Sequence, residues 1–350
     1  MIPNNILYNH VLKAIQYLDE NGIPSNRQST KYYMIYSGRY YPPKLVISIS
    51  NKYSNGEELQ PGIFSGGKEA NEYLQGLGFE VIPNSSDERS FINVATCVLQ
   101  NVYKLGNKKR KDLLKYIIDE IGSEHDVIIL PAGFLKFEYF EPEVIKDEAN
   151  DISEYLDIME CRTNVCYGVD CRDNMDQLAL SVTSEGIKGI GRKFFPTDGE
   201  KGYIDAAGSL VSEESGYTRI VDIKGCKAYL AVCYDVFGIK KIGKENVGVD
   251  IIIDLIHKFN PKGSSDGGSS EVLFARHGLA GASKGWNCPV FASAEFIRRN
   301  ISQDWPTGVM WDLGDRSTKD WTYRDNTMKV KKEKNLTYKS AIVNVLSYEW

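Results

Sequence analysis

The sequence lacks the features that would place it in a membrane or on a secretory route. No apolar run in its 350 residues approaches the roughly 20 residues that a spanning helix needs. The opening residues, MIPNN, show no charged start followed by an apolar core and a cleavage site. We therefore expect a soluble, cytoplasmic protein without a membrane partner.

Long blocks of one charge sign are also absent. The net charge of −5 is spread along the chain, so bulk electrostatics favour neither nucleic acid nor a membrane surface as partner. The seven cysteines are scattered and odd in number, which suits reduced thiols better than a secreted disulfide framework. An apolar content of 42% and a charged content of 25% are those of an ordinary globular protein, long enough for a full-sized core and a second, smaller domain.

Two patterns that could bind a metal ion or a phosphate group are incomplete. Cys161, Cys166 and Cys171 are separated by four residues each, with no fourth cysteine or histidine nearby, a poor match to the tight pairs of structural zinc sites. The Gly/Ser-rich stretch 262–270 lacks the Gly-Lys-Ser/Thr ending of a phosphate-binding loop. We expect no metal site and no cofactor.

Residues 1–83 predict a small α+β domain. An apolar stripe at 7–18 indicates a helix that Asn21-Gly22 ends, Pro42-Pro43 can start a second helix, and Ser65 is the expected N-cap of a third. A short strand follows at 79–82, and the polar segment 84–90 is the expected linker.

The tyrosine-rich part of this domain allows two interpretations. Arg39, Tyr40, Tyr41 and Lys44 could stack on bases and contact phosphates. Alternatively, the aromatic rings form the core of a small domain and the charges are solvated.

Alternating apolar strands and helices predict a layered α/β domain over residues 91–328. Its clearest strands are expected at 91–99, 126–133, 165–169, 178–182, 187–190, 217–223, 228–233, 247–255 and 289–294, and its clearest helix at 108–121. In the segment 329–350, several lysines precede an apolar end. That segment is either an oligomer interface or packs on its own domain.

Two positions in this domain could supply chemistry. The apolar run 228–232 ends in Cys233, which places a thiol at the tip of a strand, beside backbone N–H groups that could hold a thiolate or an oxyanion. Lys193 precedes two aromatic residues at another strand end, where a partly desolvated ammonium could stabilise negative charge. A core cysteine and a solvated lysine are the alternatives.

Three segments together resemble the carbon-nitrogen hydrolase, or nitrilase, superfamily: 127–133, 192–196 and 229–235, in that order. The resemblance runs from about Phe91 to Leu313 and implies an α-β-β-α sandwich, after the small α+β domain, in a homo-oligomer. It implies hydrolysis of a small-molecule amide or nitrile, with Cys233 as nucleophile, Lys193 as charge-stabilising residue and Glu200 as the second glutamate, which positions substrate. Loops such as 134–151 and 258–270 would form the pocket walls.

Residue 132 departs from this family. The general-base glutamate belongs directly after Pro131, where this chain has Ala132. Loss of such a group typically costs about 10²–10⁴-fold in rate. The chain is therefore either an enzyme silenced by a deliberate substitution, which the retained Lys193, Glu200 and Cys233 favour, or a natural pseudoenzyme that binds a ligand or nucleic acid.

A second resemblance covers roughly the first 83 residues. The runs 37–44, 64–67 and 77–79 are similar to the N-terminal module of modification-dependent restriction endonucleases and other bacterial defence proteins. This resemblance implies contact with nucleic acid or with a protein partner, in a setting of bacterial anti-phage defence.

Overall fold

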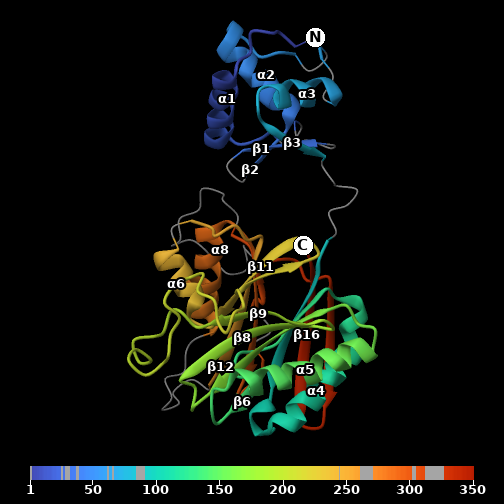
Figure 1. Ribbon diagram of the computed structural model, residues 1–350, viewed down its shortest axis with the longest axis vertical. Coiled ribbons are helices and arrows are strands. Elements are labelled where there is room, and N and C mark those ends of the chain that lie inside the picture. Colours follow the sequence, from blue (N-terminus) through green and yellow to red (C-terminus); the bar gives the residue numbers. More distant parts are fainter. Residues whose placement is uncertain are drawn as a thin grey trace. The chain divides into compact units, whose positions relative to one another are not determined.

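The chain folds into two compact units, Met1–Ser90 and Phe91–Trp350 (Figure 1). The computed structural model describes residues 2–24, 27, 32–36, 39–60, 63–64, 67–83, 91–243, 245–260, 271–301, 305–311 and 327–350. The linker expected at 84–90 lies outside these residues. Within the described ranges, no helix is long and apolar enough to cross a membrane.

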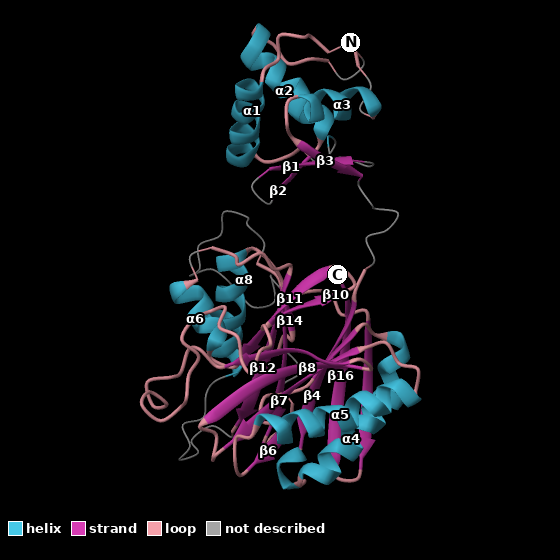
Figure 2. Ribbon diagram, in the orientation of Figure 1, coloured by secondary structure: helices cyan, strands magenta, loops and turns pink. Residues whose placement is uncertain are grey.

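The first unit packs three helices against a three-stranded antiparallel sheet of order β2-β1-β3 (Figure 2). Its elements are α1 (Tyr8–Asn21), β1 (Tyr32–Tyr36), β2 (Arg39–Tyr41), α2 (Pro43–Asn55), α3 (Lys68–Gly76) and β3 (Glu80–Pro83). The apolar stripe of α1 is buried, and Gly56 ends α2 in the left-handed conformation. Gly67 is the N-cap of α3, and the Ser65 cap expected from the sequence lies outside the described residues.

The second unit is a four-layer sandwich, which confirms the predicted α-β-β-α fold. Helices α4 (Asn107–Ile121) and α5 (Pro142–Ile158) cover one leaf of strands, and α6 (Asp235–Ile242) and α8 (Ala280–Trp286) cover the other (Figures 1 and 2). A separate apolar cluster, which includes Val127, Val232 and Ile253, fills the space between the leaves. The strands are therefore covered on both faces, by helices on one and by the opposite leaf on the other, as expected for buried strands.

The strands follow the order β10-β11-β12-β13-β4-β5-β7-β8-β9. Strands β11, β12, β5 and β7 belong to parallel pairs, so their carboxyl ends lie at matching edges of the two leaves. The bounds are β4 (Asn93–Gln100), β5 (Val127–Ile129), β6 (Leu135–Phe137), β7 (Asn164–Cys171), β8 (Asp176–Thr183), β9 (Gly186–Arg192), β10 (Ile220–Ile223), β11 (Cys226–Val232), β12 (Ile251–Phe259), β13 (Val290–Phe296), β14 (Gly308–Val309), β15 (Lys332–Tyr338) and β16 (Ala341–Glu349). Short helices are η3 (Val102–Lys104), η4 (Gly122–Glu124), α7 (Glu271–Leu273) and the π-helix η5 (Phe274–Leu279).

The expected loop at 134–151 is wrong, because most of this segment is regular structure. Pro142 occupies the first turn of α5, where its missing N–H is not needed. Ile145, Ala149 and Ile152 recur at helical spacing and pack into the core under the first leaf.

The C-terminal segment is part of the sandwich. Strands β15 and β16 form a hairpin, and β16 pairs with β4 along its whole length, from Asn93 to Gln100. Of the two interpretations of 329–350, packing on its own domain is therefore the one observed. The unit extends to Trp350 instead of ending at residue 328.

Candidate active site

Five strand ends of the second unit contribute side chains to one site at the junction of the two leaves. Backbone bonds tie the contributing segments together: the Cys233 N–H donates to the carbonyl of Leu255 at 2.9 Å, and the Ala132 N–H donates to that of Ile256 at 3.1 Å. The contributing residues are Ala132 after β5, Asp170 in β7, Lys193 after β9, Cys233 after β11 and His257 in β12.

Cys233 occupies a strained turn between β11 and α6. Its φ of 54° lies in the left-handed region, which non-glycine residues rarely adopt and which clusters at functional sites. Its side chain is partly exposed, as is that of Cys226, whereas the other five cysteines are buried. The turn therefore presents a thiol at the end of a rigid strand.

The surroundings of Cys233 favour its thiolate. Burial raises the pKa of the thiol, but a hydrogen bond from His257 and the positive charge of Lys193 outweigh burial, so the pKa lies below its ordinary value. At Cys226, burial and nearby carboxylates raise the pKa to about 12. Of these two partly exposed cysteines, Cys233 is therefore the one whose surroundings favour the ionised thiol.

Lys193 is fully buried and paired. Its Nζ donates to both carboxylate oxygens of Glu200 at 2.8 Å and to Oε1 of Gln177 at 3.0 Å. Burial raises the pKa of Glu200, but the Lys193 charge more than offsets it, and the net pKa is lowered. The structure thus brings Lys193 and Glu200 together as a charged pair beside Cys233.

Asp235 fixes the Lys193 segment to the Cys233 turn. One carboxylate oxygen accepts the backbone N–H groups of Phe194 and Phe195, each at 2.9 Å, and the other accepts that of Val232 at 3.0 Å. Both the carboxylate and the guanidinium of Arg219, 3.6 Å away, are fully buried. The lysine and the thiol are therefore positioned by one buried side chain.

Ala132 lies where the sequence predicts, in the turn after β5, and is 5% exposed. The turn can approach β7 because Gly168 has no side chain: a Cβ there would lie 2.2 Å from the Cα of Ala132. Arg110 of α4 is buried and donates to the carbonyls of Gly133 at 3.0 Å and Phe134 at 2.8 Å. The methyl group at 132 offers no proton acceptor.

Two residues that sequence reasoning missed lie beside Cys233. The Nε2 of His257 lies 3.0 Å from Oδ1 of Asp170, and His257 is close enough to Cys233 for each group to shift the pKa of the other. Burial lowers the pKa of His257, but the charge and hydrogen bond of Asp170 outweigh it and raise that pKa to about 9. The available signal was weak: Asp170 and His257 are polar residues within two largely apolar strands, but β12 also contains Asp254 and Lys258.

The tyrosine-rich segment of the first unit is divided between core and surface. Tyr41 is buried, and its hydroxyl donates to Asp19 at 2.7 Å. Arg39 is 65% exposed and forms an ion pair with the same carboxylate at 2.9 Å. Tyr41 is therefore a core residue, in line with the second interpretation of this segment.

The other two candidates differ in what they contact. Tyr40 is 51% exposed, and the Lys44 ammonium lies 5.4 Å from the ring centre of Phe64, a distance typical of a cation–π contact. Of the two candidate tyrosines, Tyr40 and Tyr41, Tyr40 is thus the one exposed enough to contact a partner.

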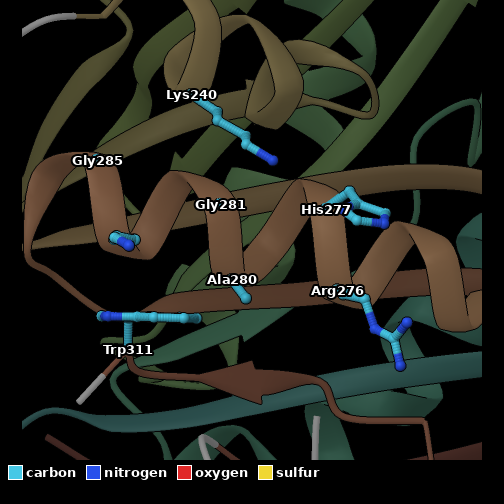
Figure 3. Close-up of a pocket in the computed structure, with 8 residues that line it drawn as sticks. Lys240, Arg276, His277, Ala280, Gly281, Gly285 and Trp311 are labelled. Carbon is cyan, nitrogen blue, oxygen red and sulfur yellow. The ribbon is translucent and has the colours of Figure 1, made fainter. Parts of the chain in front are cut away.

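A cavity of about 190 Å³ lies on the helices that cover the second leaf (Figure 3). Its lining includes the basic residues Lys240, Arg276, His277 and Lys284, with Trp311. Figure 3 shows Lys240, Arg276 and His277 spread around the helix instead of converging on one point. The lining contains no cysteine or serine, and its basic side chains suit attraction of an anion.

The three cysteines with regular spacing do not form a centre. Cys161, Cys166 and Cys171 are buried thiols. In the described part of the chain, no group of three His, Cys, Asp or Glu side chains could hold a metal ion.

Comparison with known proteins gives results for both units. Residues 4–83 match the family described as ScoMcrA-like, N-terminal head domain. A search of curated proteins finds no match. Similar solved structures include a mutant of the amidase from Nesterenkonia sp. AN1, at 12% identity and a TM-score of 0.41, covering 58% of this chain and 78% of that one.

Two further structures are similar. A carbon-nitrogen hydrolase from Helicobacter pylori G27 has 16% identity and a TM-score of 0.42, covering 61% of this chain and 75% of that one. A glutamine-dependent NAD(+) synthetase from Cytophaga hutchinsonii has 13% identity and a TM-score of 0.45, covering 74% of this chain and 43% of that one. The chain thus has a head-domain match at its N-terminal end and carbon-nitrogen hydrolases among its structural neighbours.

Proposed function

We propose that the second unit hydrolyses a non-peptide C–N bond in a small amide or nitrile, with Cys233 as the nucleophile. The observation that carries the proposal is a partly exposed thiol in a strained strand-end turn, with its pKa lowered beside the buried Lys193. Strained geometry and a perturbed pKa at one residue are typical of catalytic positions.

The neighbouring charges suit this reaction. When Sγ attacks the amide carbon, negative charge develops on the oxygen, and the Lys193 ammonium can stabilise it. Glu200 holds the Lys193 side chain in place through two hydrogen bonds of 2.8 Å, and its 25% exposed side chain can also contact substrate. Collapse of the intermediate releases ammonia or an amine, and water then hydrolyses the thioester.

The reaction also requires a proton carrier, and residue 132 is alanine. If the family's glutamate were the only group able to serve, the chain would be silent, as the resemblance implies. The alternative to an enzyme is then a pseudoenzyme whose pocket binds a ligand.

Ammonia release over a panel of amides and nitriles tests the proposal. The chain as given, Ala132→Glu and Cys233→Ala are compared, with Cys226→Ser as the matched control because Cys226 is the other partly exposed thiol. We expect turnover and an acyl adduct on residue 233, seen by intact mass, to vanish in Cys233→Ala and persist in Cys226→Ser. Adducts confined to other cysteines would refute the proposal.

We propose a docking role in bacterial defence for the first unit, supported by the head-domain match at 4–83. Residues 1–83 contain seven Lys or Arg and seven Asp or Glu, so their net charge of zero provides no general attraction to phosphates. Nucleic-acid binding that falls steeply with salt and with Arg39→Ala or Lys44→Ala would identify nucleic acid as the partner. Gel filtration with light scattering tests the expected homo-oligomer.

A further inference from the structure

We propose that His257, positioned by Asp170, takes the proton of Cys233 and passes it to the leaving nitrogen, in place of the glutamate that residue 132 lacks. The inference rests on the proposed function of Cys233. It predicts that the chain as given is a working hydrolase with a Cys-His-Asp arrangement on the sandwich.

The contacts of His257 fit a proton carrier. Its Nε2 is engaged by Asp170 at 3.0 Å, so Nδ1 is the ring nitrogen that remains for the thiol. The Cys233 N–H donates to the carbonyl of Leu255, two residues before His257, at 2.9 Å, which keeps the thiol beside this part of β12. Asp170 is only 3% exposed, whereas His257 is 20% exposed. A carboxylate behind an imidazole fixes the ring orientation and stabilises the imidazolium, while the partly exposed ring can meet substrate.

Gly133 shows that the turn after β5 accommodates this pair. A Cβ at this position would lie 2.3 Å from Oδ2 of Asp170 and 3.3 Å from Cδ2 of His257. Gly133 also has a φ of 59°, which glycine adopts without strain. The imidazole and its carboxylate therefore pack directly against the turn from which the family's glutamate would project.

The charged groups around His257 support the assignment. Asp170 from β7 and the Cys233 thiolate after β11 raise its pKa, and Lys193 after β9 acts on the same thiolate. Arg110 of α4 acts on Asp170 from the far side. Glu200 is paired with Lys193, and a further carboxyl group near the thiol is that of Asp254 in β12.

Asp254 is a poor base. It is fully buried, and its two carboxyl oxygens have no partner of good hydrogen-bond geometry among the described residues. Burial, together with the thiolate and Asp235, raises its pKa well above the ordinary value. Asp254 therefore holds its own proton more tightly than an ordinary carboxyl group, and we assign the proton exchange with Cys233 to His257.

The steps balance with water as the only co-reactant. The Cys233 thiolate attacks the amide carbon, and the π electrons move to the oxygen. When the C–N bond breaks, the nitrogen takes the proton from the His257 imidazolium and leaves as an amine. His257 then removes a proton from water, whose oxygen attacks the thioester. The carboxylic acid leaves, its proton goes to solvent at neutral pH, and the thiolate–imidazolium pair is restored.

Alkylation of Cys233 tests the inference without a substrate. The rate of iodoacetamide addition, followed by intact mass and peptide mapping from pH 5 to 9.5, reports the thiolate fraction of residue 233. The intact chain should react through neutral pH. In His257→Asn the titration should move to higher pH, with a loss of about tenfold in rate at pH 6 for each unit that the pKa rises. Asp170→Asn should move it in the same direction by a smaller amount.

Controls separate this inference from the proposed function. His277→Asn removes an exposed histidine elsewhere in the unit and should leave the profile unchanged, whereas Ala132→Glu in the His257→Asn chain tests whether the family's base can substitute. A reactive Cys233 whose profile does not move in His257→Asn or Asp170→Asn would overturn the inference and leave the proposed function standing. An intact chain whose residue 233 never alkylates would overturn both. If His257→Asn fails to fold, Asp170→Asn and His257→Gln supply the same comparison.

Discussion

Removal of the Asp235 carboxylate should destabilise the second unit and uncouple its lysine from its thiol. Asp235→Ala leaves three buried N–H groups, those of Phe194, Phe195 and Val232, without their acceptor. An unsatisfied buried donor costs about 1–3 kcal/mol, and the buried Arg219, 3.6 Å away, loses its counter-charge. Since removing the carboxylate also removes its own desolvation cost, we expect a net loss of about 3–5 kcal/mol in unfolding free energy.

Asp235→Asn separates shape from charge. Burial is the largest influence on the Asp235 carboxyl and raises its pKa, so the charge itself is costly and the amide should lose less, about 1–3 kcal/mol. One amide oxygen can still accept two of the three N–H groups. The NH₂ group must then face the third donor, that of Val232, which is the source of the remaining cost.

Tryptophan fluorescence during urea unfolding measures these losses, because all five tryptophans lie in the second unit. For a unit of this size, about 3–5 kcal/mol corresponds to a fall of roughly 6–20 °C in Tm. Asp198→Ala, at a side chain 95% exposed, is the control and should change stability by less than about 0.5 kcal/mol. A loss of less than about 1 kcal/mol in the unfolding free energy of Asp235→Ala would refute the conclusion that Asp235 holds the Lys193 segment against the Cys233 turn.

Three further outcomes are expected. Gly133→Ala should slow alkylation of the Cys233 thiol, because the added Cβ displaces the Asp170 carboxylate. The control is Gly216→Ala, at a φ of 80° with nothing within 4 Å, which imposes similar backbone strain and should leave the alkylation rate unchanged. The His257 pKa of about 9 lies above its ordinary 6.5, so the protonated imidazole stabilises the folded state fully below pH 6.5 and this contribution is lost as the pH rises through 9. Between these pH values, the unfolding free energy of the unsubstituted chain should therefore fall more steeply than that of His257→Asn, by at most roughly 3 kcal/mol. Tyr41→Phe should lower the stability of the first unit by about 1 kcal/mol through loss of one hydrogen bond, and calorimetry that shows no change would contradict a structural role.

The strand pattern and three chemical residues could be predicted from the sequence because each leaves a local signal. Apolar runs that end in Cys233 or precede Lys193 indicate strand tips, and Glu200 follows at a fixed interval. His257 and Asp170 could not be paired in this way, since 87 residues separate them and each lies within its strand instead of in the turn that follows it. Their contact depends on the two leaves closing on each other, which is a property of the tertiary fold.

The same limit explains the interpretation of Ala132. A sequence signature shows that a carboxylate is missing at one position, but it cannot show that a group from another strand has come to the same thiol. Helix α5 was missed for a related reason. The family resemblance implied a pocket-wall loop at 134–151, whereas Pro142 stands in the first turn of a helix, where proline is favoured.

The loss of native-state stability at the Cys233 site argues against a second unit without catalytic activity. A fully buried ammonium at Lys193, a non-glycine residue with a φ of 54° and a poorly partnered buried carboxyl at Asp254 each destabilise the native state. All three lie at one thiol. The charge of Lys193 lowers the pKa of the Cys233 thiol, the strained backbone conformation belongs to Cys233 itself, and the Asp254 carboxyl lies beside the Cys233 turn. Hydrophobic residues of similar volume at positions 193 and 254 would give a more stable sandwich. A ligand-binding pseudoenzyme has no use for a thiolate between an imidazolium and an ammonium, whereas a nucleophile that must be ionised at neutral pH requires both.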